Sequence, residues 1–187
     1  RVPRAGAAPG LYRNITGSES LAYGLIAGGQ LADLPITFAS YPITPASSLL
    51  HTLSGQKQFN VVTFQAEDEI AAVCAAIGAS FSGSLGITSS SGPGISLKAE
   101  AISLASATEL PLIVVNTQRG GPSTGLPTKT EQSDLNQSLF GRHGDSMLPV
   151  ISCSTSVDCF DVAIEAVRIA TQFMTPVILL SDGYMAN

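Results

Sequence analysis

Charged side chains are scarce in this sequence, since Asp, Glu, Lys and Arg together make up 12% of its 187 residues. Globular domains ordinarily carry about twice that fraction. Hydrophobic residues reach 44%, so we expect part of the surface to be covered by a partner, although a neutral monomeric domain rich in Ser, Thr and Gly would have a similar composition. The formal net charge is −5 and the basic residues are scattered singly, which argues against nucleic-acid binding.

Long apolar runs and clustered cysteines are also lacking. The longest apolar segments, such as LPLIVV at residues 110–115, are far too short to cross a bilayer, so no membrane association is expected. The three cysteines, Cys74, Cys153 and Cys159, are odd in number and lack the spacing of metal ligands. They indicate reduced thiols packed in the core of a cytoplasmic protein, and no metal site is expected in this chain.

The chain divides into a short start and one domain. RVPRAGAAPGLY has the composition of a linker, so residues 1–13 are predicted to be a linker or tail and residues 14–187 a single domain. Within that domain, β-branched runs alternate with Ala-rich segments. This alternation predicts an α/β fold with three layers, α/β/α, around a mainly parallel six-stranded sheet. The predicted strands span 36–41, 61–65, 85–90, 111–117, 150–154 and 176–181, and the predicted helices span 17–33, 46–54, 68–82, 94–108, 130–140 and 156–173.

The carboxyl ends of parallel strands form the ligand crevice of such a sheet. After the first strand comes SYPITPAS, in which Pro42 and Pro45 stiffen the backbone around Thr44. One interpretation is that Thr44 is held for a functional contact. The other is an ordinary helix start at Pro45, with Thr44 or Ser47 as its cap.

Three consecutive acids, Glu67, Asp68 and Glu69, follow the second strand. Acids in the first turn of a helix are stabilised by the helix dipole, which explains one or two of them. Three in a row repel each other, and a carboxyl group that faces an apolar crevice has a raised pKa, which suits proton transfer. The segment is therefore a candidate for acid–base chemistry.

The loops after the third and fourth strands carry further candidates. TSSSGPG, residues 88–94, offers hydroxyl and backbone N–H groups ahead of a helix, which is a weak signal for anion or ring binding. The sequence has neither G-x-G-x-x-G nor G-x-x-x-x-G-K-[ST], the motifs of dinucleotide and phosphate loops. The long polar loop that begins at Arg119 suggests function. Arg119 could bind a carboxylate, or it could order the loop by pairing with Glu131 or Asp134.

Four of these segments together resemble the alpha subunit of 2-oxoacid:ferredoxin oxidoreductases, in particular the 2-oxoglutarate branch. They are YPITPAS, QAEDEIAAVCAAIGAS, SSGPG and QRGGPSTGLPTKTEQSDLNQSLFGRHGD. The resemblance runs from about residue 14 to the end, and the long arginine loop is its most specific part. One departure is Ser18 in GSESLAYG, where the family usually has Asn. This difference changes the contacts that are expected at that opening turn.

The resemblance implies the pyrimidine-binding domain of a thiamine diphosphate enzyme. This domain is expected to be an excerpt of a longer subunit, or one piece of a split subunit, that cannot catalyse the reaction alone. The family oxidises 2-oxoglutarate to succinyl-CoA, with coenzyme A as co-substrate and ferredoxin as electron acceptor. By the same resemblance, the cofactor is expected to be shared with a beta subunit that holds Mg²⁺ and a [4Fe-4S] cluster, in an α2β2 heterotetramer. Alternatives are the same chemistry on pyruvate or branched-chain 2-oxoacids, a non-catalytic scaffold domain, or a module that binds an organic acid by itself.

The resemblance also assigns residues. In thiamine enzymes the catalytic Glu opens a helix with a Gly nine residues on, and Glu69 and Gly78 have that spacing. Glu69 is therefore expected beside N1′ of the aminopyrimidine ring. Thr44 matches the threonine that hydrogen-bonds the 2-oxoacid, and Arg119 matches the arginine that holds its carboxylate. Glu67 and Asp68 become neighbouring or interface groups, and the residues expected to contact the cofactor with Glu69 are Tyr41, Pro42, Ile43, Ser91 and Gly92.

Overall fold

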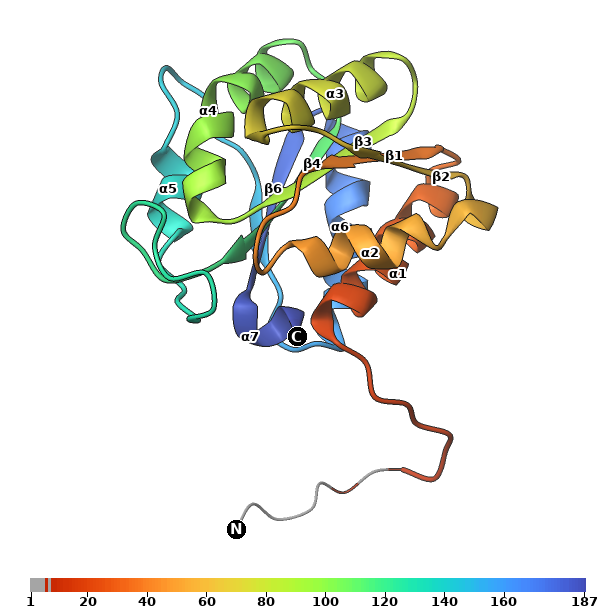
Figure 1. The fold of residues 1–187 in the computed structure, drawn as a ribbon. Helices are drawn as coiled ribbons and strands as arrows, with labels where there is room; N and C mark the ends of the chain where they lie inside the picture. Colours follow the sequence, from red (N-terminus) through yellow and green to blue (C-terminus); the bar gives the residue numbers. More distant parts are fainter. Residues whose placement is uncertain (1–5, 7) are drawn as a thin grey trace.

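A parallel sheet forms the centre of the molecule (Figure 1). The computed structural model describes residue 6 and residues 8–187. The six strands lie in the order β2-β1-β3-β4-β6-β5, and every neighbouring pair is parallel. The predicted α/β fold is thus confirmed. The strands are β1 (Ile36–Ser40), β2 (Val61–Gln65), β3 (Leu85–Ser90), β4 (Leu112–Gln118), β5 (Val150–Ser152) and β6 (Pro176–Asp182).

Helices cover both faces of the sheet, as Figure 1 shows. Side chains of α1, α2 and α6 form one apolar cluster with Phe38, Ile113 and Val115 of the strands. Side chains of α3 and α4 form a second cluster with Leu112 and Val114 on the opposite face. Successive residues of β4 therefore point to alternate clusters, which explains why a central parallel strand is apolar throughout. The helices are α1 (Gly17–Leu31), α2 (Ser47–Ser54), η1 (Lys57–Phe59), α3 (Glu69–Phe81), α4 (Gly92–Ala107), α5 (Leu135–Phe140), α6 (Asp158–Phe173) and α7 (Gly183–Ala186).

The first helix begins at a capping box. The backbone N–H of Glu19 donates to Thr16 Oγ1 at 3.2 Å, and the backbone N–H of Thr16 donates to Glu19 Oε2 at 3.1 Å. Two N–H groups that have no partner within the helix are satisfied in this way. The predicted linker over residues 1–13 lies partly outside the described residues, and residues 8–13 belong to no helix or strand.

One local prediction was wrong. The helix predicted over 130–140 is confined to α5, because side chains hold the preceding residues in a loop: the backbone N–H of Asp134 donates to Gln118 Oε1, and Glu131 Oε2 accepts from the N–H of Gly121. At the C-terminal end, the backbone N–H groups of Tyr184 and Met185 in α7 donate to Asp182 Oδ1. In both segments, hydrogen bonds between side chains and the nearby backbone determine the local structure.

The three cysteines are free, but they differ in environment. Cys153 and Cys159 are buried as expected, whereas Cys74 is exposed on α3, so the prediction of a core position for Cys74 was wrong.

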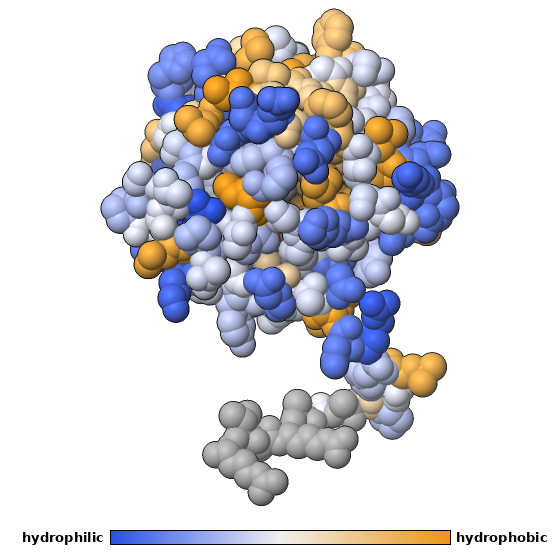
Figure 2. Space-filling model, viewed as in Figure 1, coloured by the Kyte–Doolittle hydropathy of each residue, from blue (hydrophilic) through white to orange (hydrophobic). Residues whose placement is uncertain are grey.

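Hydrophobic side chains gather over α3 and α4 at the top of the view in Figure 2, and the exposed hydrophobic residues of these two helices include Ile70, Phe81 and Leu104. In the described part of the chain, every helix is too short or too polar to cross a membrane.

Candidate functional site

Four of the loops selected from the sequence meet at one edge of the sheet. Strands β1, β3 and β4 are adjacent and parallel, with β2 beside β1, so their carboxyl ends lie together. Tyr41 follows β1, Glu69 follows β2, Ser91 follows β3 and Arg119 follows β4. The order of the strands therefore brings candidates from distant parts of the sequence to a common crevice.

The start of α3 separates the roles of the three consecutive acids. Asp68 is the N-cap, and its Oδ1 accepts the backbone N–H of Ala71 at 2.8 Å. Asp68 and Glu67 are exposed, while Glu69 in the first turn is only half exposed. The position of Asp68 is thus explained by its role as the N-cap of α3, because acids are favoured at the start of a helix. Glu69 is the acid that turns toward a neighbouring helix.

Glu69 meets Tyr41 and Ser90 at a glycine of α4. A Cβ atom on Gly94 would collide with Ser90 Oγ and with the Tyr41 hydroxyl, and it would lie 2.9 Å from Glu69 Cγ. The Tyr41 hydroxyl and Ser90 Oγ are 2.7 Å apart, and Tyr41 is 6% exposed. Burial raises the pKa of Tyr41, with the neighbouring Glu69 acting in the same direction, so its hydroxyl stays protonated. The missing side chain at Gly94 is what allows a carboxyl group and two hydroxyl groups to converge.

A buried lysine lies behind this group, and nothing in the sequence had singled it out. Lys98, one helical turn after Gly94, is 0% exposed. Its Nζ donates to Thr88 Oγ1 at 2.7 Å and to the carbonyl oxygen of Ser89 at 3.4 Å. Nζ also lies 5.3 Å from the centre of the Tyr41 ring, within the range of a cation–π contact.

Burial lowers the pKa of Lys98 to about 7, and Glu69 is the group that most opposes this change. An unfolded lysine binds its proton up to about pH 10.4. Between about pH 7 and 10 the unfolded chain therefore binds more protons at Lys98 than the folded chain, so this residue makes stability rise with pH across that window. The folded lysine therefore titrates near physiological pH.

Arg119 joins the loop after β4 to the loop after β1. Its Nη1 donates to the backbone carbonyl of Thr44 at 2.7 Å, and its Nη2 donates to the carbonyl of Thr124 at 2.6 Å. Arg119 is 7% exposed, and among the described residues its Nε has no hydrogen-bond partner. The alternative that Arg119 pairs with Glu131 or Asp134 was wrong, because it bonds main-chain carbonyls instead. Each terminal nitrogen still carries a second N–H that is free to bind an anion.

The proline-rich segment before α2 does not form a capped helix start at Pro45. The helix begins at Ser47 after Ala46, and no side chain caps it. Ser47 Oγ instead accepts the backbone N–H of Ile43 at 3.0 Å and donates to the carbonyl of Ile43 at 3.1 Å. That alternative was therefore wrong. The side chain of Thr44 is exposed, and the part of Thr44 held by Arg119 is its carbonyl.

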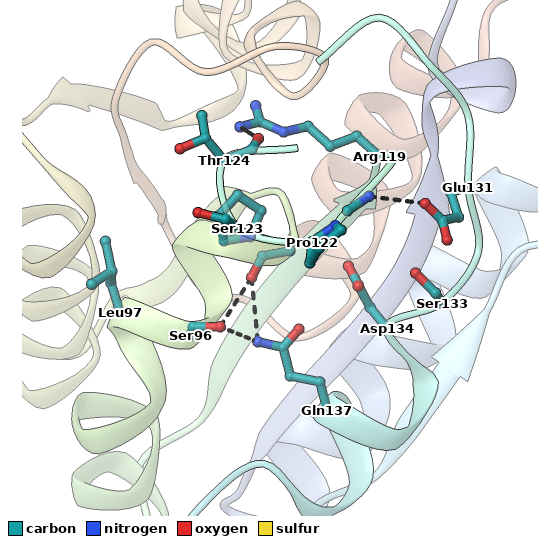
Figure 3. Close-up of a pocket in the computed structure, with 13 residues that line it drawn as sticks. Ser96, Leu97, Arg119, Pro122, Ser123, Thr124, Glu131, Ser133, Asp134 and Gln137 are labelled. Atoms are coloured by element: carbon teal, nitrogen blue, oxygen red, sulfur yellow. Dashed lines mark hydrogen bonds between the residues drawn. The ribbon is translucent and has the colours of Figure 1, made fainter. Parts of the chain in front are cut away.

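A cavity of about 720 Å³ lies between the start of α4 and the arginine loop (Figure 3). Of the residues selected from the sequence, Gly92 and Arg119 line it, whereas Glu69, Tyr41 and Thr44 do not. Figure 3 shows Arg119 reaching toward Thr124 on one side and Asp134 beside Gln137 on the other. The other lining residues are Pro93, Ser96, Leu97, Gly121, Pro122, Ser123, Thr124, Glu131, Ser133, Asp134 and Gln137.

Asp134 fixes the floor of this cavity. Its Oδ2 accepts from Asn116 Nδ2 at 3.1 Å, and it lies so close to Gly92 that a Cβ there would be 2.7 Å from Oδ2. Burial raises the pKa of Asp134, and the Asn116 hydrogen bond partly opposes that change. Ser91 is 0% exposed at the N-cap of α4, and in the described structure its Oγ has no hydrogen-bond partner. A ligand at this edge could satisfy that hydroxyl group.

Comparisons with known proteins agree with the earlier resemblance. Residues 29–187 match the family described as pyruvate flavodoxin/ferredoxin oxidoreductase, thiamine diphosphate-binding. The chain is 62% identical over 186 residues to the 2-oxoglutarate oxidoreductase subunit KorA of Mycobacterium tuberculosis, covering 100% of this chain and 28% of that protein. It is 42% identical to the 2-oxoglutarate synthase subunit KorA of Archaeoglobus fulgidus, covering 92% of this chain and 49% of that protein.

A solved structure has the same fold. The 2-oxoglutarate:ferredoxin oxidoreductase of Magnetococcus marinus, with 2-oxoglutarate, coenzyme A and succinyl-CoA bound, matches with a TM-score of 0.86 and 40% identity. The match covers 92% of this chain and 29% of that one. The chain thus spans less than half the length of these relatives. It belongs to the thiamine diphosphate-binding family of pyruvate flavodoxin/ferredoxin oxidoreductases.

Proposed function

We propose that this chain is the pyrimidine-binding domain of the alpha subunit of a thiamine diphosphate-dependent 2-oxoglutarate:ferredoxin oxidoreductase. The enzyme would decarboxylate 2-oxoglutarate oxidatively to succinyl-CoA and pass the electrons to ferredoxin. The convergence of Glu69, Tyr41 and Ser90 around Gly94 carries the proposal, because it presents a carboxyl group at a sheet edge in a chain similar to 2-oxoglutarate oxidoreductase subunits.

The residues at this edge fit an aminopyrimidine ring. Gly94 leaves the space in which Glu69 and the Tyr41 hydroxyl meet, and the half-exposed Glu69 is open to a ligand from the crevice. Among the described residues, the buried hydroxyl group of Ser91 has no hydrogen-bond partner. Ile43 packs with Tyr41 on the apolar side of the group. A flat ring with polar edge atoms would pack against this apolar wall and give the hydroxyl group of Ser91 a hydrogen-bond partner.

The carboxylate of Glu69 would hold a proton at N1′ of that ring. When bound, thiamine diphosphate supplies the nucleophilic carbon that attacks a 2-oxo carbon and takes up the electron pair released with carbon dioxide. Glu69 is suited to the proton because it is ionisable, half-buried and fixed in the first turn of a helix. Tyr41, held by Ser90 and kept protonated, would support the ring from the side without competing for that proton.

Arg119 would bind the carboxylate of the 2-oxoacid. It lines the 720 Å³ cavity, and its Nε–H and remaining terminal N–H groups are unused by the chain's own carbonyls. By fixing the carbonyl of Thr44, Arg119 would also set the position of the Thr44 hydroxyl relative to the 2-oxo group. The exposed side chain of Thr44 is accessible to a substrate from the crevice.

The remaining parts of the enzyme are assigned to partners. The relatives are named as subunits, which supports a beta subunit that shares the cofactor and would carry Mg²⁺ and a [4Fe-4S] cluster. Coenzyme A in the related solved structure supports it as the acyl acceptor. We place the α2β2 assembly in the cytoplasm, with the apolar surface of α3 and α4 as a candidate contact for the partner subunit.

A substrate panel tests the proposed function. The complete oxidoreductase that contains this chain, assayed for ferredoxin reduction with 2-oxoglutarate, pyruvate and branched-chain 2-oxoacids, should give the largest kcat/KM with 2-oxoglutarate and require thiamine diphosphate and coenzyme A. A preference for pyruvate or branched-chain acids would contradict the substrate assignment. An intact complex that binds no thiamine diphosphate would instead favour the scaffold alternative.

Gly94→Ala tests whether the space beside Gly94 is needed to bind the pyrimidine ring. The added methyl group would displace Ser90 Oγ, the Tyr41 hydroxyl and Glu69 together. Because losing about 1.4 kcal/mol of contact energy weakens binding tenfold, we expect at least about tenfold weaker thiamine diphosphate binding, measured by calorimetry on the complete enzyme. Gly78→Ala is the matched control, since a Cβ there meets nothing within 4 Å. Equal affinities for the two variants would contradict the assignment.

A further inference from the structure

Lys98 is a buried charged residue that the proposed chemistry does not use. It projects from α4 into the space between that helix and β3, and it has no contact with solvent. A lysine is almost never fully buried unless its charge serves a purpose or is neutralised. Its surroundings therefore require an explanation beyond packing.

The geometry links Lys98 to the carboxyl group at the sheet edge. Nζ is anchored by Thr88 Oγ1 at 2.7 Å, and this contact holds it 5.3 Å from the centre of the Tyr41 ring. The hydroxyl end of the same ring meets Ser90 Oγ and the side chain of Glu69 at Gly94. Tyr41 thus lies near both the ammonium group of Lys98 and the side chain of Glu69. The charges of Lys98 and Glu69 are close enough to influence each other.

The titratable groups that face Lys98 come from two segments. From α3 and its N-cap, Glu69 has the largest effect, followed by Asp68 and then Cys74, and all three favour the protonated lysine. From the segment after β1, Tyr41 presents its ring face. Strand β3 contributes only the neutral groups of Thr88 and Ser89. The site is therefore poised so that the lysine can be either charged or neutral near physiological pH.

We propose that Lys98 is a positioning residue whose protonation state sets how strongly Glu69 holds a proton on the aminopyrimidine ring. The inference rests on the proposed function. A charged Lys98 offsets the negative charge of Glu69 and weakens its attraction for the ring proton. A neutral Lys98 leaves that charge uncompensated and strengthens the attraction. Thiamine diphosphate should accordingly bind more tightly above pH 7 than below it.

The sign follows from the pKa of about 7 for Lys98. In the wild-type enzyme, thiamine diphosphate affinity measured by calorimetry should rise about tenfold between pH 6 and pH 8, since 1.4 kcal/mol of coupling corresponds to a factor of ten. Lys98→Met should lose this step and resemble the wild type at pH 8. Lys98→Arg, which stays charged, should resemble the wild type at pH 6 throughout. The pH profile of kcat/KM should change in the same way.

A second variant covers the case in which Lys98→Met does not fold. Thr88→Val keeps the shape of a buried side chain but removes the acceptor of the Lys98 hydrogen bond. Since that bond favours the charged lysine, the step in affinity should move to lower pH. Lys57→Met replaces an exposed lysine and is the matched control, with the step expected to stay in place.

The outcomes separate this inference from the proposed function. A wild-type complex that binds no thiamine diphosphate overturns the proposed function. A complex that binds it and turns over a 2-oxoacid, but whose Lys98→Met or Thr88→Val variants keep the wild-type step near pH 7, overturns only the role of Lys98. A uniform loss of affinity at every pH, with the step retained, would likewise show that Lys98 merely supports the fold.

Discussion

Replacing Glu69 with Gln lowers the rate of 2-oxoacid oxidation by the complete enzyme by about 10²–10⁴-fold, which is the usual contribution of a general acid or base. Gln has the size and hydrogen-bonding reach of Glu, so it should leave Tyr41, Ser90 and the start of α3 in place. The amide cannot carry the negative charge that holds a proton on the ring. The measurement is thiamine diphosphate-dependent reduction of ferredoxin, with assembly checked by gel filtration.

Glu67→Gln is the matched control for this experiment. Glu67 lies two residues before Glu69 and is exposed, so its replacement removes the same charge from the same segment. We expect its rate to stay close to that of the wild type. An active Glu69→Gln enzyme, or equal losses in the two variants, would refute the assignment of Glu69. Asp68 is unsuitable as a control because it caps α3.

Replacing Arg119 with Leu should lower kcat/KM for the 2-oxoacid by at least about 10²-fold. The guanidinium group donates to the carbonyls of Thr44 and Thr124, and a hydrogen bond from a charged group contributes about 1.5–3 kcal/mol. Losing both contacts frees Thr44 and the loop together, and it also removes the charge offered to the substrate. Steady-state kinetics with varied 2-oxoacid would show the loss mainly as a higher KM.

Two variants distinguish a role in the site from a role in the fold. Arg119→Lys keeps the charge but cannot bridge two carbonyls, so most of the loss should persist. Arg142 also donates to backbone carbonyls, those of Ser138, Leu139 and Ser146, but it does not line the cavity. Arg142→Leu should therefore reduce stability and leave KM unchanged. The substrate role of Arg119 fails if its Leu variant behaves like that of Arg142.

The sheet could be predicted because the strands have sequence patterns that are typical of buried strands. Residues 112–115 are apolar without interruption, which is typical of a strand covered on both faces, and the structure buries every residue of β4. The choice of Glu69 among the three acids came from the family resemblance, because Glu69 and Gly78 have the spacing found in thiamine enzymes. Its position in the first turn of α3, half exposed, agrees with that choice, while its contact with the cofactor stays a prediction.

Other parts of the site depend on contacts between distant residues and left no local signal. Lys98 lies in an ordinary helical segment, and its burial follows only from the packing of α4 on β3. Arg119 could be singled out as a scarce cation, but its carbonyl partners depend on where the β1 loop lies in space. Asp134 reaches the start of α4 because Asn116 and Gln118 hold it from β4. Sequence spacing cannot report such distances.

The carbonyl contact between Arg119 and Thr44 has a consequence for how these loops can diverge or be redesigned. A main-chain oxygen is present whatever the residue type, so other side chains could be introduced at position 44 while the backbone there keeps its anchor. Changes in the loop around Thr124 act differently, since they shift the shared guanidinium group and thereby move the segment at Thr44, which lies 75 positions before Arg119. Libraries aimed at new substrates should therefore vary position 44 alone first, and the two loops only in combination.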